Sequence, residues 1–110
     1  MQTYDVEIKL PVYEQIIEIT KYIKNILIAP DAAQKRKNQI LSDIRQLENF
    51  PERGFDADQK IGTKLLPNHK TFGLPIVNGK YILLYYIHEK TVTVIDLLPT
   101  QSDYAKLFLS

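Results

Sequence analysis

The chain has no cysteine among its 110 residues, so disulfide bonds, thiolate metal sites and a cysteine nucleophile are all excluded. It has no apolar run near the roughly 18–20 residues that a membrane-spanning helix needs. Its first ten residues, MQTYDVEIKL, contain no apolar block of the signal-peptide kind. The net charge of +1 gives no general attraction to nucleic acid. We therefore expect a cytoplasmic protein with no membrane partner, folded as a single domain over residues 1–110.

The hydrophobic period changes once near the N-terminus. Residues 3–10 alternate between polar and apolar side chains, which predicts a half-buried strand that Pro11 ends. From Val12 the apolar residues recur every three or four positions, which predicts an amphipathic helix of about four turns. The predicted inward stripe consists of Val12, Ile16, Ile19, Ile23 and Ile26, widened by Tyr13, Ile17 and Leu27.

A second helix follows after the sequence APDAAQ. Pro30 stops the first helix, and Asp31 with Gln34 three residues later resembles a capping box. The helix is expected to run to about Phe50 and to pair with the first helix as an antiparallel α-hairpin. Its expected inward residues are Ala33, Ile40, Leu41, Ile44 and Leu47. The basic run at residues 34–38 is interpreted as a solvated helix face.

The C-terminal half predicts a β-meander after a surface loop at residues 50–62. Asn78-Gly79 favours a two-residue turn, because both central positions of a type I′ turn need positive φ. Residues 80–87 are almost wholly apolar or aromatic, as expected of a central strand covered on both faces. Glu89-Lys90 predicts the next turn, and residues 91–98 the last strand. Ser102 or Asp103 can then cap a short final helix.

The expected fold class is α+β with the order β-α-α-β-β-β and a short C-terminal helix. The antiparallel meander and the N-terminal strand form one sheet, because the apolar face of the first strand must be buried against the meander. The α-hairpin packs on one side of this sheet.

Four segments in this order resemble the RelE/ParE superfamily, the toxins of bacterial type II toxin–antitoxin modules. They are EIKLPVYEQIIEITKYI, PDAAQKRKNQILSDIRQLENFPERG, GLPIVNGKYILLYYI and DYAKLF, and together they cover nearly the whole chain. The long helical hairpin favours the ParE-like branch.

The resemblance implies a growth-inhibiting toxin paired with a cognate antitoxin, with which it could form a hetero-oligomer. The antitoxin segment is expected to lie in an apolar groove beside the α-hairpin. The ParE branch inhibits DNA gyrase and is not expected to act as an enzyme. Two alternatives stay open: a RelE-like endonuclease that cuts mRNA on the ribosome, and a catalytically inactive toxin fold retained as a binding module.

The basic residues that the RelE motif requires are missing from their positions. That motif places an arginine directly after the aromatic residue that opens the hairpin strand, but Tyr81 is followed by Ile82. It also places arginine or lysine in the turn after the last strand, but residues 97–103 read LLPTQSD. Because guanidinium groups are the best phosphate clamps, this departure argues against RelE-type catalysis.

Candidate substitute catalytic residues remain, and each also has a plain structural explanation. They are His69, Lys70, Lys80, His88 and Tyr104. His69 with Tyr104 is the acid–base pair that we would test first. Alternatively, His88 is a turn residue and Tyr104 packs its ring on the sheet. Neither histidine has a second ligand at helical or hairpin spacing, so we expect no metal site and no cofactor.

Overall fold

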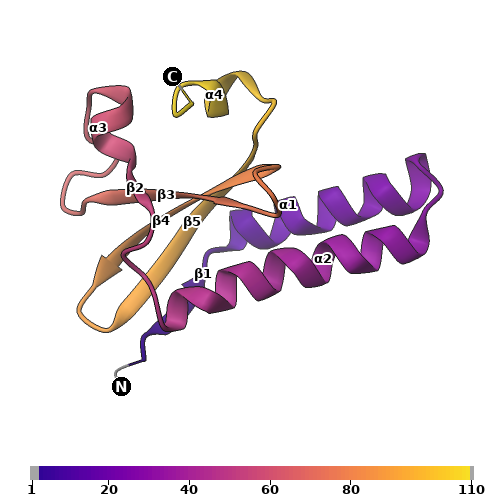
Figure 1. Ribbon diagram of the computed structural model, residues 1–110, viewed down its shortest axis with the longest axis horizontal. Helices are drawn as coiled ribbons and strands as arrows, with labels where there is room; N and C mark the ends of the chain where they lie inside the picture. The colour runs from indigo at the N-terminus through magenta and orange to yellow at the C-terminus, as the bar shows by residue number, and fades with distance from the viewer. Residues whose placement is uncertain (1–2, 110) are drawn as a thin grey trace.

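The computed structural model describes residues 3–109, in which an antiparallel helical hairpin packs on a mixed five-stranded sheet (Figure 1). The strands are β1 (Asp5–Ile8), β2 (Phe55–Asp56), β3 (Thr71–Ile76), β4 (Tyr81–His88) and β5 (Thr91–Pro99). They lie in the order β1-β5-β4-β3-β2, with β1 parallel to β5 and the other pairs antiparallel. The α+β class and the C-terminal meander are therefore confirmed.

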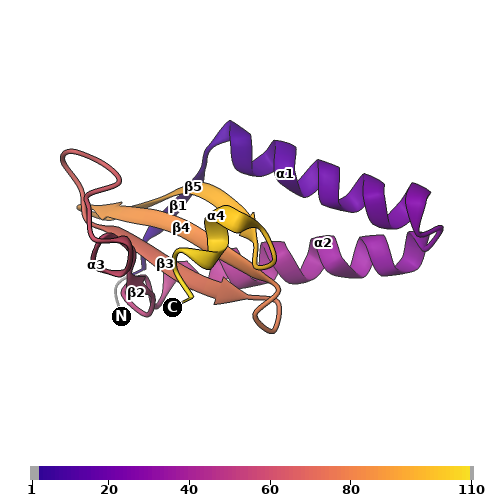
Figure 2. The same ribbon diagram turned by 90° about the horizontal axis from the view of Figure 1, so that it is seen from above.

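The helical hairpin is longer than the sheet that supports it. It consists of α1 (Leu10–Lys21), a π-helical segment η1 (Tyr22–Ile26), α2 (Pro30–Arg45) and a 3-10 turn η2 (Gln46–Glu48). Figures 1 and 2 both show the two helices side by side, with their connection projecting beyond the edge of the sheet. Within residues 3–109, no helix combines the length and apolar character needed to cross a membrane.

Pro11 and Pro30 both lie at the start of a helix, whereas the sequence predicted that each ends the preceding element. β1 ends at Ile8 and α1 begins at Leu10, so Pro11 lies in the first helical turn. Pro30 opens α2 in the same way, with Ala29 at the N-cap position. Proline fits there because the first N–H groups of a helix have no intrahelical acceptor.

The predicted capping box at the start of α2 is wrong. Ala29, whose methyl group offers no acceptor, takes the N-cap position, and Asp31 lies inside the first turn. Gln34 reaches forward instead, donating from Nε2 to Asn38 Oδ1 at 3.1 Å. Because α2 already begins at Pro30, Asp31 and Gln34 lie inside the helix and cannot act as its N-cap.

The predicted loop at residues 50–62 is wrong in part, because it contains β2 and the short helix α3 (Ala57–Ile61). The Asp56 side chain caps α3 by accepting from Gln59 N–H at 3.0 Å. The neighbouring Asp58 carboxylate accepts from the backbone N–H groups of Leu65 and Thr71. Elements this short have too few residues to show a hydrophobic period, so the pattern gave no warning of them.

Each face of the sheet carries its own apolar cluster. On the hairpin face, buried residues of α1 and α2 pack against Leu83, Tyr85 and Val94. On the other face, α3 and α4 (Asp103–Lys106) cover Ile82 and Leu84. The expectation that β4 is covered on both faces is therefore confirmed along its first five residues.

The turns of the meander lie where the sequence predicts them. Asn78 and Gly79 both have positive φ, at 54° and 80°, and Lys80 N–H donates back to Val77 O at 3.1 Å. Positive φ is thus found at both predicted positions. The predicted length of two residues is wrong, because Val77 also has a positive φ of 51° and the strand pairing closes at Ile76 and Tyr81, which leaves residues 77–80 in the loop. The turn after β4 contains Glu89 at a φ of 54°.

Candidate functional site

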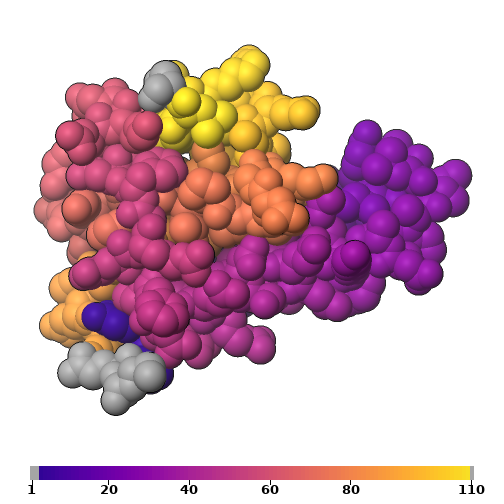
Figure 3. Space-filling model, in the orientation of Figure 1, coloured from indigo at the N-terminus to yellow at the C-terminus, as the bar shows by residue number. Residues whose placement is uncertain are grey.

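An apolar hollow lies between the projecting half of the hairpin and the adjacent end of the sheet. It is a groove of about 830 Å³, visible in Figure 3 as the recess between the purple hairpin and the orange and yellow C-terminal segments. We call it the hairpin groove. Its lining residues are Glu18, Ile19, Tyr22, Ile23, Leu27, Ala29, Ala32, Arg36, Gly79, Lys80, Tyr81, Pro99, Thr100 and Gln101.

Large apolar side chains remain exposed on the hairpin side of this groove. Tyr22 is 55% exposed and Leu27 is 56% exposed. Beside them Ile26 and Ile28 are also exposed at the hairpin tip. The predicted inward positions Tyr13, Ile17, Ile26 and Leu27 are therefore wrong. Ile26 and Leu27 are exposed because the sheet is too short to cover the distal turns, whereas Tyr13 and Ile17 lie on a different face of α1 from the buried Val12 and Ile16.

The tip also carries an unusual backbone. The helix switches to the π form over Tyr22–Ile26, and Ile28 has a φ of 51°. A β-branched residue in the left-handed region is strained, and both features are more frequent at functional sites than elsewhere. Ile28 is 81% exposed, so its apolar side chain does not compensate for the strain within the described chain.

Arg36 and Tyr81 meet at the floor of the groove. The Arg36 Nη1 group donates to Tyr81 Oη at 2.7 Å, and the guanidinium carbon lies 5.7 Å from the centroid of the ring. The interpretation of residues 34–38 as a solvated face is therefore wrong for Arg36. The sequence did contain a signal, because Arg36 falls in line with the buried residues Ala33 and Ile40 at helical spacing.

Two of the predicted site residues come together at the opposite end of β4. The His69 ring stacks on Tyr86 at a centroid distance of 4.2 Å and meets the edge of His88 at 5.5 Å. His88 Nε2 lies 4.0 Å from a carboxylate oxygen of Glu89. We call His69, Tyr86 and His88 the histidine cluster. Its proximity was missed because His69 lies in an irregular segment, which has no period from which to predict a position.

Tyr104 lies elsewhere, with its ring centroid 5.7 Å from that of Phe108. Its helix follows the end of β5, where Pro99 pairs with Tyr81, whereas His69 stacks on Tyr86. Tyr86 lies five positions after Tyr81 in β4, which corresponds to about 17 Å at 3.3 Å per residue. The structure therefore places the two members of the suggested acid–base pair at different ends of the strand.

The two candidate lysines are also separated. Lys70 Nζ lies 3.8 Å from an Asp56 carboxylate oxygen and 5.1 Å from the centroid of the Phe72 ring. Lys80 is the last residue of the turn between β3 and β4 and lines the hairpin groove.

The corner after β5 has an architectural role. Ser102 caps α4, its Oγ accepting from Ala105 N–H at 3.2 Å and donating to Pro99 O at 2.7 Å. Thr100 holds the adjacent turn through hydrogen bonds to Lys80 O and Gly79 O. The predicted cap is confirmed at Ser102.

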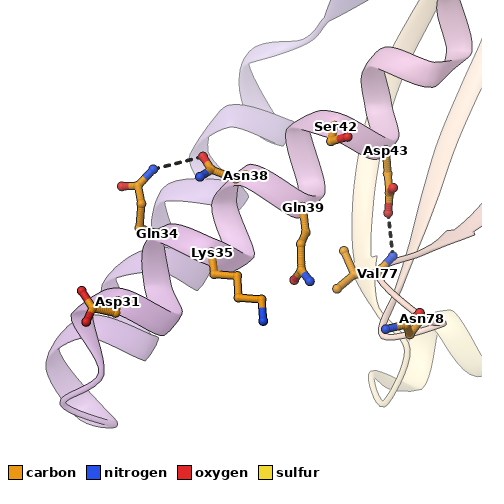
Figure 4. A pocket seen from close by; sticks show the side chains of 9 residues that line it. All are labelled: Asp31, Gln34, Lys35, Asn38, Gln39, Ser42, Asp43, Val77 and Asn78. Atoms are coloured by element: carbon orange, nitrogen blue, oxygen red, sulfur yellow. Dashed lines mark hydrogen bonds between the residues drawn. The ribbon is translucent and has the colours of Figure 1, made fainter.

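A second, polar hollow of about 640 Å³ runs along the other side of α2 (Figure 4). Its best-defined contact is structural, because Asp43 Oδ2 accepts from Val77 N–H at 2.9 Å and fixes the start of the turn. Asp31 and Lys35 lie farther along the helix and do not converge on a shared point (Figure 4). Across residues 3–109, no group of three or more metal-ligating side chains forms.

Tyr85 has the largest change in pKa, but for structural reasons. Burial raises the pKa of its phenol to about 12, and Gly54 N–H donates to its oxygen at 3.2 Å. The ring also stacks on Phe72 at 5.4 Å between centroids. The phenol ties the segment before β2 to the central strand.

A helical hairpin on a mixed sheet, closed by a C-terminal helix, defines a toxin domain of the RelE/ParE superfamily. Residues 6–104 match the family described as "ParE toxin of type II toxin-antitoxin system, parDE", and the chain belongs to this family. It is the toxin component of a type II toxin–antitoxin module.

A solved structure shows the same fold. It is titled "Chromosomal ParDE TA system from P. aeruginosa", and it matches with a TM-score of 0.69 at 12% sequence identity. The match covers 88% of this chain and 96% of that chain. A search of curated proteins gives no match.

Proposed function

We propose that this toxin arrests growth by inhibiting DNA gyrase and that a cognate antitoxin neutralises it by occupying the hairpin groove. The observation that carries the proposal is the separation of the candidate catalytic groups. The residues that could replace a phosphate clamp are divided between the two ends of β4, and the corner after β5 is neutral or acidic. Membership of the ParE family supports the choice of gyrase as target.

The groove suits a protein segment better than a nucleic acid. Its hairpin wall is formed by Tyr22, Ile23 and Leu27, and its sheet wall includes Tyr81 and Pro99. An amphipathic helix or an extended peptide buries its apolar anchors in such a groove. Covering the exposed tyrosine and leucine side chains would remove apolar surface from water and stabilise the complex.

A second apolar surface lies on another side of α1. Leu10, Tyr13 and Ile17 are exposed and share one helical face, because they are spaced by three and four residues. At 100° per residue this face is turned about 110° from the buried face of Val12 and Ile16. Two separate apolar surfaces support a toxin with two protein partners.

A supercoiling assay tests the target. Purified toxin should inhibit the supercoiling of relaxed plasmid by gyrase, and the toxin–antitoxin complex should not. A Tyr13→Asp/Ile17→Asp variant tests whether the second apolar surface takes part. Unchanged supercoiling at saturating toxin would remove gyrase as the target.

The histidine cluster gives a second candidate function, a ribosome-dependent mRNA endonuclease. Two imidazoles and a phenol within stacking distance could transfer protons, with Lys70 nearby in the sequence as a cation. This candidate predicts cleavage of ribosome-bound mRNA that His69→Ala or Tyr86→Phe abolishes, whereas Tyr104→Phe, which lies outside the cluster, leaves it intact. Intact transcripts alongside arrested growth would argue against it. Normal growth after induction of the toxin alone would instead favour an inactive binding module.

A further inference from the structure

We propose that Arg36 and Tyr81 form a carboxylate receptor at the floor of the hairpin groove. The partner segment that occupies the groove would then carry an aspartate or glutamate between its apolar anchors. The inference rests on the proposed function, because it takes the antitoxin as the occupant.

Arg36 occupies a position where the helix pattern calls for an apolar side chain. It is half-buried, in line with Ala33 and Ile40, and it lies among apolar groove residues. Partial burial of a guanidinium costs free energy unless an anion and hydrogen bonds compensate. Over residues 3–109, no carboxylate oxygen lies within 4.0 Å of the Arg36 guanidinium, so the groove holds a partly desolvated cation without its anion.

The donors around this cation fit a carboxylate. Arginine has five N–H groups in a planar fork, and the described chain uses one of them, at Tyr81. Because Tyr81 Oη accepts from Arg36, its own hydrogen is left to donate to the same incoming oxygen. Two guanidinium N–H groups and one phenol O–H would hold a carboxylate in the bidentate manner that arginine prefers.

The charges along the groove also favour a protein segment that carries an acidic residue. Arg36 and Lys80 line it together with one acid, Glu18, so the lining has an excess of one positive charge. Two cations among apolar walls are too few to follow a phosphate backbone, which carries a charge on each nucleotide. They suit an apolar segment with an isolated acidic residue, and such a charge pair fixes the register of the segment.

The test uses the antitoxin encoded beside the toxin gene as the probe, with its affinity measured by calorimetry. Arg36→Glu should weaken binding by about a hundredfold and Arg36→Gln by at least about tenfold, because each leaves the partner carboxylate buried without its cation. Lys35→Glu is the matched control. It makes the same charge change one residue away, on the side of α2 that lines the polar hollow (Figure 4), and should weaken binding less than about threefold.

A growth assay separates binding from toxicity. Induced alone, Arg36→Glu should still arrest growth, but antitoxin should no longer rescue the cells. Changing one acidic residue of the antitoxin to lysine should restore rescue of Arg36→Glu while weakening rescue of the wild type. Tyr81→Phe, which removes only the phenol oxygen, should produce a smaller loss of affinity than Arg36→Gln.

Each contrary result has a distinct meaning. Equal affinity of wild type and Arg36→Glu would overturn the carboxylate receptor while leaving the antitoxin proposal intact. If Lys35→Glu weakens antitoxin binding as much as Arg36→Glu does, the effect comes from the general charge of the helix, and the carboxylate receptor is again overturned. Loss of toxicity in a folded Arg36→Glu variant would place Arg36 on the target surface instead. An antitoxin that fails to bind the wild-type toxin would overturn both proposals.

Discussion

The two halves of the helical hairpin have similar apolar spacing but different surroundings. In the proximal half, Val12, Ile16, Ile40 and Ile44 are buried against the sheet. The distal half projects past the sheet edge (Figure 1). Its apolar residues Tyr22, Ile26, Leu27 and Ile28 remain exposed. The apolar period continues along the whole hairpin, but only the part that packs against the sheet forms a hydrophobic core. The comparison therefore assigns stability to the proximal half and partner binding to the distal half.

The largest effect on folding is expected from truncation in the proximal half. Ile44→Ala removes a side chain that is 2% exposed and packed in the hairpin-face cluster. It should lower the free energy of unfolding by about 3–4 kcal/mol, through lost burial and the cavity left behind. Chemical denaturation measures this change. Leu27→Ala, the distal control, should cost less than about 1 kcal/mol, and equal losses would break the comparison.

The distal half should show the reverse behaviour. Tyr22→Asp/Leu27→Asp introduces charge into the wall of the hairpin groove, and should weaken antitoxin binding by about a hundredfold or more, because buried anchors dominate interfaces. The thermal midpoint should move by less than about 4 °C. Calorimetry and thermal denaturation of the same samples provide the two readings. A large fall in the thermal midpoint together with unchanged antitoxin affinity would reverse the assignment.

The alkaline stability of the proximal core should depend on Tyr85. An ordinary tyrosine has a pKa near 10, and burial raises that of Tyr85 to about 12. The neutral phenol is thus favoured in the folded state, so its contribution is complete below pH 10 and is lost as pH rises through 12. The wild type should lose about 2 kcal/mol more over this interval than Tyr85→Phe does. Tyr13→Phe, at an exposed position, serves as control and should retain the wild-type loss.

The smallest effect concerns the strained tip. Ile28→Gly should stabilise the toxin by about 1 kcal/mol, because glycine adopts the positive φ of this position without a Cβ clash. If the exposed isoleucine contributes to binding, affinity for antitoxin should fall while stability rises. Ile26→Gly, in the helical segment, should instead destabilise the toxin by a similar amount. Stabilisation by both variants would contradict the strain assignment.

The sequence predicted the elements that have a period or a turn signature. The hairpin, the strands of the meander, the Asn78-Gly79 turn and the Ser102 cap could all be recognised in this way. It could not predict β2 and α3, which are too short to show a period. Nor could it show where the sheet ends beneath the hairpin, and therefore which apolar residues stay exposed.

The candidate site illustrates the same division. The histidines were correctly noticed as chemical groups, but their contact with each other depends on an irregular segment. Arg36 was passed over because its neighbours in sequence are basic, although its neighbours in space are Tyr81 and the apolar groove. Helical spacing was the better guide to Arg36 than local composition.

The most direct test of the account is amide hydrogen exchange of the toxin with and without its antitoxin. Binding in the hairpin groove predicts new protection at Tyr22, Ile23 and Leu27, at Lys80 and Tyr81, and at Thr100 and Gln101. These residues are far apart in sequence but together line the groove. The backbone around His69 and His88 should exchange as it does in the toxin alone. Protection centred on the histidine cluster, with the hairpin tip unchanged, would contradict the account.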